Sequence, residues 1–217
     1  MFFVGFDPGG KNAFGWAVLQ LVGTELRNVA SGTCSGADEA VQESAAHCPV
    51  GGPAVVSIDA PLFWVDDGDR QADIRVRDQV VSNGGKAGTV NHVNSLRGAC
   101  LVQGVQVARF AREKWPKTKL NEAHPKALLC AYPAAEEFLR RASKGLRKKA
   151  SAHEKDAVLA AYAGHALAVK LRGWHDLVRV EERLQKIFSP ARAPVRYWFP
   201  KPSGISKRTA AAARPER

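Results

Sequence analysis

The chain has 217 residues, of which 45% are hydrophobic and 24% charged, as is usual for a soluble globular protein. No apolar stretch approaches the length of a membrane span, and the N-terminal apolar run lacks the basic start of a signal peptide. The four cysteines are scattered without a C-x-x-C pair, which argues against a zinc ribbon or redox motif. We expect reduced thiols, a cytoplasmic location and no membrane partner.

The formal net charge is +11. A strongly basic soluble domain commonly binds phosphate groups, most often those of nucleic acid. The alternative is a basic surface that only aids solubility.

The N-terminal part is predicted to form a β-meander. Phe2–Asp7 is an apolar run that ends in an acid and meets a Pro-Gly-Gly turn, as expected of a buried strand. Ala13–Leu21 and Glu25–Thr33 are predicted to be the second and third strands. A helix is expected over Ala37–His47.

Ala54–Asp59 repeats the pattern of the first strand: an apolar run, an acid and a proline turn. Because a helix leads to it, we expect this strand to lie parallel to the first and beside it. Asp7 and Asp59 would then emerge at one edge of the sheet, where open α/β sheets bind their ligands. The alternative is that each aspartate only opens a turn.

Residues 62–92 form a long polar connection, which in a compact domain is usually an active-site lid or else disordered. A short helix is predicted over Arg70–Val80. Its charged residues Arg70, Asp73 and Arg77 would form an internal ion-pair network or order the connection over the site, and the sequence does not separate these possibilities.

The second half is predicted to alternate strands and helices. Ser151 is a plausible N-cap for the longest late helix. We interpret residues 1–200 as a single domain and 201–217 as a basic, mobile tail. The predicted elements are a helix over Val93–Lys114, a short strand within Lys119–Pro125 that ends in an acid and a proline, a helix over Lys126–Arg141 that Pro133 could break, helices over Ala152–Leu171 and Trp174–Phe188, and an edge strand over Val195–Pro200.

This order of elements, with acids ending three strands and a fourth acid opening a late helix, is the plan of the ribonuclease H-like α/β fold. We expect a mixed five-stranded sheet of order 3-2-1-4-5, with strand 2 antiparallel. Gly5-Phe6-Asp7-Pro8-Gly9 resembles the opening motif of the RuvC-type Holliday-junction resolvases. The segment from His153 to Asp156, followed by an Ala-rich helix, resembles their last motif. The three-residue spacing puts His153 and Asp156 on one helix face.

The ordered motifs are also similar to domain of unknown function 429, a family of predicted ribonuclease H-like nucleases. Two features differ: the Pro8-Gly9 turn is closer to the resolvases, and Lys126 follows His-Pro where the family usually has an acid. The matching stretches are Val4–Asp7 with Gly15-Trp16, Ile58–Leu62, Arg70-x-x-Asp73-x-x-x-Arg77, Glu122–Pro125 and Asp156-Ala157.

The resemblance implies a metal-dependent nuclease. Carboxylate oxygens suit Mg²⁺ or Mn²⁺, and two such ions can activate a water and stabilise the leaving oxygen of a phosphodiester. Asp7 would be the central ligand, Asp59 and Asp156 would complete the metal sites, and Glu122 would be a fourth catalytic carboxylate.

Each assignment has a structural alternative. Asp156 could be a helix N-terminal acid favoured by the macrodipole, and Glu122 an acid paired with a basic neighbour. His153, which with Lys155 could position water or phosphate, is interpreted as a solvated first-turn residue. His124 is interpreted as a structural hydrogen-bonder.

Basic residues would contact nucleic acid, or else form a solvated face. The candidates are Lys11, Arg140, Arg141, Lys144, Arg147, Lys148 and Lys149.

Two other functions stay open. One is a non-catalytic nucleic-acid-binding protein with this fold. The other is a nucleotide-binding phosphotransferase of the actin-like ATPase type, although 217 residues are too few for its paired lobes. Resolvase-like enzymes act as dimers, so the resemblance also implies a homodimer.

Overall fold

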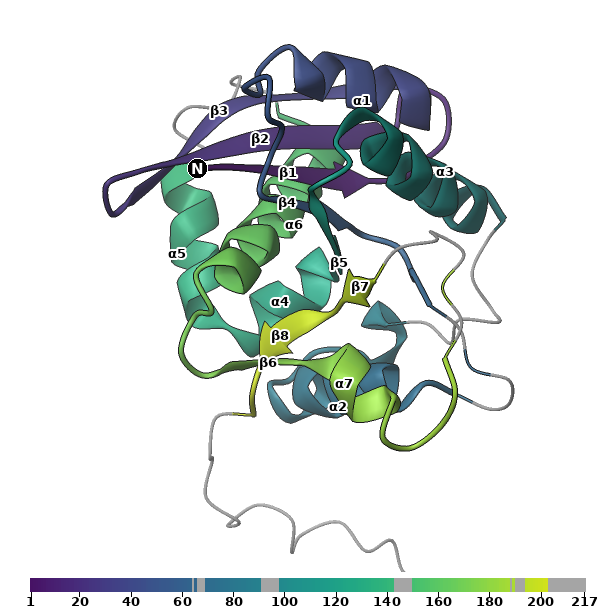
Figure 1. The fold of residues 1–217 in the computed structure, drawn as a ribbon. Helices are drawn as coiled ribbons and strands as arrows, with labels where there is room; N and C mark the ends of the chain where they lie inside the picture. The colour runs from purple at the N-terminus through teal and green to yellow at the C-terminus, as the bar shows by residue number, and fades with distance from the viewer. Residues whose placement is uncertain are drawn as a thin grey trace, which may run out of the picture.

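A six-stranded mixed sheet organises the chain (Figure 1). The ribonuclease H-like order is confirmed, with β2 antiparallel to β1 and one further strand at the edge. β4, β5 and β7 run parallel to β1. Across the sheet the strands are β3 (Glu25–Cys34), β2 (Phe14–Val22), β1 (Phe2–Asp7), β4 (Val55–Ile58), β5 (Lys119–Glu122) and β7 (Val195–Arg196).

The computed structural model places most of the chain. None of the helices in the part it describes is long and apolar enough to cross a membrane. The candidates Lys144, Arg147, Lys148 and Lys149 and most of the predicted tail lie outside the described residues. Those residues are 1–63, 65, 69–90, 98–142, 150–187, 189 and 194–202.

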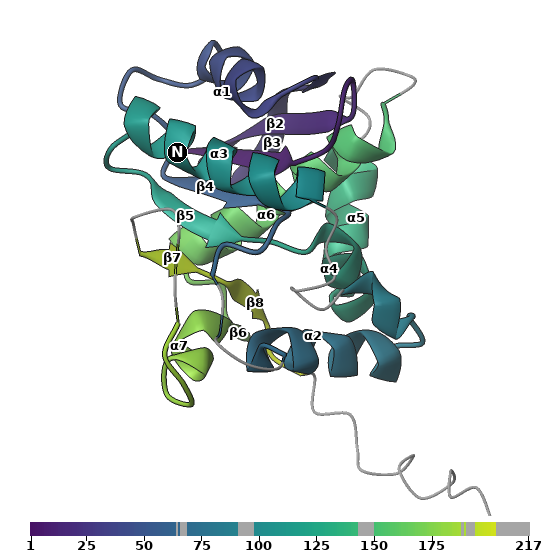
Figure 2. The ribbon, with the colours of Figure 1, turned by 90° about the vertical axis from the view of Figure 1, so that its right-hand side faces the viewer.

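Helices cover both faces of the sheet (Figure 1, Figure 2). α1 and α3 pack together on one face, and α6 crosses the other face against β1, β2 and β4. α5 packs on α6, and α2 packs between α4 and α7. The helix bounds are α1 (Ala37–Ala45), α2 (Gln71–Ser82), α3 (Gly98–Lys114), α4 (Pro125–Ala131), α5 (Pro133–Ala142), α6 (Ala152–Ala168) and α7 (Leu177–Glu181), with a short 3-10 turn at Ala87–Thr89.

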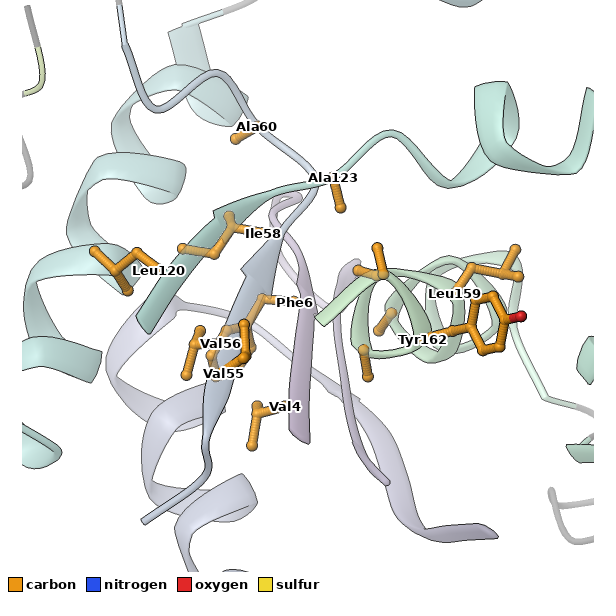
Figure 3. Close-up of a cluster of buried hydrophobic side chains, with 14 of the residues drawn as sticks. Val4, Phe6, Val55, Val56, Ile58, Ala60, Leu120, Ala123, Leu159 and Tyr162 are labelled. Atoms are coloured by element: carbon orange, nitrogen blue, oxygen red, sulfur yellow. The ribbon is translucent and has the colours of Figure 1, made fainter. Parts of the chain in front are cut away.

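The core lies on both sides of the central strands. Figure 3 shows Ile58 and Leu120 on the side of the sheet away from α6, which carries Leu159 and Tyr162. Ile58, Leu120 and Leu159 have no exposed surface. Burying an aliphatic side chain of this size contributes about 1.5–3 kcal/mol, so this packing fixes the strands that carry the candidate acids.

Two glycines let α6 approach the sheet closely. A Cβ atom at Gly5 would overlap the carbonyl oxygen of Ala157, and one at Gly15 would overlap that of His153. The predicted N-cap Ser151 is confirmed: its hydroxyl accepts from the N–H of Glu154, and the Glu154 carboxylate accepts from the N–H of Ser151. Together these features fix the first turns of α6 at the ends of β1 and β2.

The predicted helix over Trp174–Phe188 is wrong. Trp174–Asp176 forms strand β6, which pairs antiparallel with β8 (Trp198–Pro200), and only the five residues of α7 are helical. The Asp176 carboxylate accepts from the N–H groups of Val178 and Tyr197 and so joins the two segments. A distant strand partner has overridden local helix propensity. The predicted edge strand over Val195–Pro200 accordingly splits between the two sheets.

The long connection contains more packed structure than its polarity suggests. Leu62 and Phe63 are fully buried, and the helix predicted over Arg70–Val80 is present as α2, displaced by one to two residues along the chain. α3 begins at Gly98, and the preceding residues of its predicted helix lie outside the described part of the chain. α1 ends at Ala45, two residues before the predicted end.

Candidate active site

Asp7 and Asp59 emerge side by side from neighbouring strands. Phe6 of β1 and Ile58 of β4 are paired in a parallel register, and the N–H of Asp59 donates to the carbonyl of Phe6 at 2.9 Å. Adjacent strands lie about 4.8 Å apart. The prediction that β4 runs parallel beside β1 is confirmed, and the two aspartates follow paired residues at one edge of the sheet.

Both aspartates lie on the face covered by α6. Asp7 shares its side of β1 with Gly5, which lies against Ala157. In β4, Ser57 lies beneath Gly164 of α6, and the alternation of side chains continues to Asp59.

The first turns of α6 add two site residues. His153 Nδ1 lies 2.6 Å from Asp7 Oδ2, and Asp156 is only 7% exposed. The prediction that His153 and Asp156 share a helix face holds. His153 is partly solvated, as interpreted, with 43% of its side chain exposed, and it also contacts Asp7. Gly15 explains the contact, because it lets the His153 backbone rest on β2.

Lys126 is the second residue of α4, directly after His124-Pro125. Its Nζ lies 3.3 Å from Asp156 Oδ2, and its side chain is 70% exposed. The ammonium group therefore stands at the rim of the site and partly neutralises the aspartates.

A cavity of about 170 Å³ opens at these side chains. It has room for several waters, each of which occupies about 30 Å³ in the liquid. The described side chains that line it include Asp7, Asp59, Thr89, Cys100, His124 and Lys126.

Nearby cations balance little of the negative charge of the aspartates. Burial, reinforced by the charge of Asp156, raises the pKa of Asp7 despite its hydrogen bond to His153. Burial raises the pKa of Asp59 to about 7, and the charges of Asp7 and Asp156 add to the effect of burial while His124 and Lys126 oppose it. The Asp59 carboxylate forms no ion pair or side-chain hydrogen bond with the described residues. A bound cation would favour the ionised form of both aspartates.

Glu122 belongs to a different cluster, centred on the fully buried Arg70. Arg70 Nη2 lies 2.7 Å from Glu122 Oε1 and 2.7 Å from Asp73 Oδ1, so its guanidinium bridges the two carboxylates. Glu122 also accepts from the N–H of Leu62 at 2.8 Å and lies 3.1 Å from His124 Nε2. Arg70 and His124 together lower the pKa of Glu122 to about 2 although burial alone would raise it.

Strand register explains why Glu122 and Asp59 are separated. Ile58, not Asp59, is paired with Glu122, and a shift of one residue moves a side chain to the opposite face. Asn121 lies on the α6 face, where its amide donates to Ser57 Oγ at 3.2 Å. Glu122 therefore points away from the face that carries the aspartates.

Ligand atoms of Asp73, Glu122 and His124 all lie within 4.8 Å of one another, a spacing that could hold a metal ion. The Arg70 guanidinium already donates to both carboxylates, at 2.7 to 3.1 Å. A divalent ion would have to displace a buried cation, so this cluster is the weaker metal candidate.

The other supporting candidates have structural contacts. Arg77 pairs with Asp69 and donates to the carbonyl of Val90 at 3.3 Å, so it connects parts of the long segment next to Thr89. The predicted hydrogen-bonding role of His124 agrees with its contact to Glu122, and its ring packs against Tyr197 at 5.3 Å.

Among the predicted nucleic-acid contacts that the structure describes, Lys11, Arg140 and Arg141 are exposed. Arg140 and Arg141 pair with Glu137 on α5. Lys155 is exposed on α6 beside the site. None of these four basic residues lines the cavity at Asp7 and Asp59.

Two lining residues, Thr89 and Cys100, were not predicted. Neither has a distinctive motif, and only the packing of the long connection and α3 brings them to the cavity. Burial, with smaller effects from nearby carboxylates, raises the pKa of Cys100 to about 11, so it remains a thiol at neutral pH. Lys126 could be noticed in the sequence only as a departure from a family pattern.

The chemistry of the aspartate cluster fits a hard divalent cation. Carboxylates from β1, the end of β4 and α6 would be its oxygen ligands, and Asp59 has no cationic partner in direct contact among the described residues. Mg²⁺ and Mn²⁺ prefer such ligands and retain waters.

Comparisons with known proteins give structural neighbours only. No family model and no curated protein matches the chain, so the resemblance to domain of unknown function 429 stays a prediction. Similar solved structures include Thermus thermophilus RuvC, at 14% identity over 79% of this chain and 96% of that chain, with a TM-score of 0.45. The same protein in complex with Holliday junction substrate matches at 16% identity over 79% and 97%, with a TM-score of 0.44. The fowlpox virus Holliday junction resolvase matches at 12% identity over 78% and 99%, with a TM-score of 0.40.

Proposed function

We propose that this protein is a metal-dependent nuclease that hydrolyses phosphodiester bonds of nucleic acid. The observation that carries the proposal is the cavity lined by Asp7 and Asp59 from neighbouring strands. Asp156 lies close enough for its charge to raise the pKa of both aspartates, and it pairs with the lining residue Lys126. The net charge of +11 supports a polyanionic substrate.

In this proposal Asp7, Asp59 and Asp156 hold Mg²⁺ or Mn²⁺. When bound, two such ions supply an activated water and charge stabilisation for the leaving oxygen. His153 orients the Asp7 carboxylate through its 2.6 Å contact. His124 and Lys126 present positive charge at the cavity wall, where a phosphate oxygen can accept from them.

Glu122 has a supporting role in this proposal and is not itself a ligand. Its carboxylate holds His124 and Arg70, and both of its oxygens are occupied. The Arg70 cluster thereby fixes the start of α4, which carries Lys126.

The second candidate is a nucleic-acid-binding protein without cleavage activity. The ion pair between Lys126 and Asp156 favours it, because an ammonium group already supplies part of the charge that a metal ion would supply. It predicts salt-sensitive binding and no divalent-dependent cleavage.

The test is a cleavage screen over single-stranded, duplex, hybrid and junction substrates with Mg²⁺ or Mn²⁺, alongside Asp7→Asn. We expect cleavage of at least one substrate class that disappears with EDTA and in the variant. Calorimetric titration with Mn²⁺ gives a second readout, in which Asp7→Asn should weaken binding. Salt-sensitive binding without cleavage under any condition would select the second candidate.

A further inference from the structure

A second hollow, of about 820 Å³, shares no lining residue with the cavity at the aspartates. Its walls come from the end of α3, the start of β5, the end of α6, β6, α7, β7 and β8. β5 begins at this cavity, where Lys119 is a lining residue, and Glu122 stands at the other end of the strand. At 1.5 Å per residue, Leu167 in the cavity wall lies roughly 17 Å along α6 from Asp156. We call this hollow the basic cavity.

Positive charge dominates the basic cavity. Five of its lining residues are exposed cations that form no ion pair with the described residues: Lys117, Lys119, Lys170, Arg183 and Lys201. The acid that lines the cavity among the described residues, Asp176, already pairs with Arg196 at 3.2 Å and Arg179 at 3.8 Å. An anionic ligand would therefore meet positive charge that no described carboxylate neutralises.

The wall also holds spare hydrogen-bond donors. The ring nitrogens Trp174 Nε1, His175 Nε2 and Trp198 Nε1 are buried and have no partner among the described residues. A buried donor without a partner costs about 1–3 kcal/mol.

We propose that the basic cavity binds the phosphate backbone of a nucleic acid, at a site separate from the aspartates. The inference rests on the proposed function for the identity of the polyanion. Five unpaired cations from four separate segments exceed what one small anion needs, whereas a nucleic-acid strand brings a phosphate at every nucleotide. Aromatic rings among cations are typical of surfaces that hold single strands.

The test measures binding apart from cleavage. Fluorescently labelled single-stranded and duplex oligonucleotides are titrated in EDTA with Asp7→Asn and with the same chain carrying Lys170→Gln and Arg183→Gln. We expect the dissociation constant to rise at least about tenfold for one probe, and the slope of log affinity against log salt to fall by about 2. The matched control carries Arg109→Gln and Lys114→Gln on α3, which remove the same charge from exposed residues outside the cavity lining.

Equal losses in the two double variants would overturn the basic cavity as a specific site and leave a general charge effect. Tighter binding to phosphatidylserine vesicles than to oligonucleotides, lost in Lys170→Gln/Arg183→Gln, would overturn nucleic acid as its ligand. The two proposals can fail separately. Cleavage by the wild type with no cavity effect rejects only this inference, and a cavity effect without cleavage of any substrate rejects only the nuclease.

Discussion

Two groups of buried carboxylates lie at one end of the same sheet, and they differ in how their charge is balanced. Glu122 and Asp73 surround a buried arginine that donates to both. Asp7, Asp59 and Asp156 have only the partly exposed His153 and Lys126 as direct ion-pair or hydrogen-bond partners among the described residues. Carboxylates whose charge is balanced by a buried cation stabilise the fold. Carboxylates without such a cation are held in place by the rest of the fold, and their site favours an added cation. The comparison separates carboxylates whose charge a buried cation balances from carboxylates whose charge is left for a ligand to balance, which is the role we propose for Asp7, Asp59 and Asp156.

The largest expected effect is on the compensated side. Glu122→Gln leaves Arg70 with one carboxylate in a fully buried site, and breaking such a pair costs about 3–5 kcal/mol of unfolding free energy. Urea or guanidinium denaturation measures it. Glu137→Gln, which removes an exposed partner of Arg140 and Arg141, is the control and should change stability little. Equal stability of Glu122→Gln and wild type would remove the distinction between the clusters.

In the aspartate cluster, Asp7→Asn should reduce activity without reducing stability. We expect loss of divalent-dependent cleavage by at least about 100-fold, since even outer-shell changes cost 10- to 100-fold. The melting temperature without metal should stay equal or rise, because the variant removes a charge that burial and Asp156 disfavour. Cleavage assays and thermal unfolding in EDTA measure both. A variant as unstable as Glu122→Gln would show that Asp7 is structural.

The clusters should also respond oppositely to pH. The pKa of Asp59 is raised to about 7, so its contribution to stability is complete below about pH 4 and is lost as the pH rises through 7. The pKa of Glu122 is lowered to about 2, so its contribution is present above about pH 4.5 and is lost as the pH falls toward 2. In EDTA, the unfolding free energy of the wild type should fall by on the order of 2 kcal/mol between pH 5 and 8 because of Asp59. Asp59→Asn should lack this loss.

Unfolding curves of wild type and Asp59→Asn across that range are the measurement. Added Mn²⁺ should restore the stability of the wild type at pH 8 and leave Asp59→Asn nearly unaffected. An unchanged pH slope in Asp59→Asn would place the pH-sensitive group elsewhere.

The smallest effect concerns Lys126. Lys126→Gln removes an exposed ammonium group that contacts Asp156, so Mn²⁺ should bind a few-fold more tightly. Isothermal titration calorimetry checks this, and Lys155→Gln, on the exposed side of α6, is the matched control. Weaker metal binding in Lys126→Gln would mean that the lysine supports the site rather than competing with the cation.

The sequence by itself determined the fold and the two central acids. Two apolar runs end in Asp7 and Asp59, and a helix connects them. Because crossover rules leave few topologies for two buried strands joined in this way, the pattern is enough to predict that they lie parallel and side by side. The Ser151 cap and the resemblance of the segment from His153 to Asp156 to a resolvase motif predicted α6, with Asp156 in its first turns. The close approach of α6 that Gly5 and Gly15 allow was seen only in the structure.

Only the tertiary structure decided the rest. Whether Glu122 joins Asp59 depends on a one-residue register between β4 and β5, which no local pattern encodes. The β6–β8 pairing, which replaced a predicted helix, depends on a partner distant in the sequence. The basic cavity gathers cations from segments far apart in the chain. Local propensity and composition act on neighbours along the chain, whereas register, pairing and charge balance arise between segments that meet only when the chain is folded.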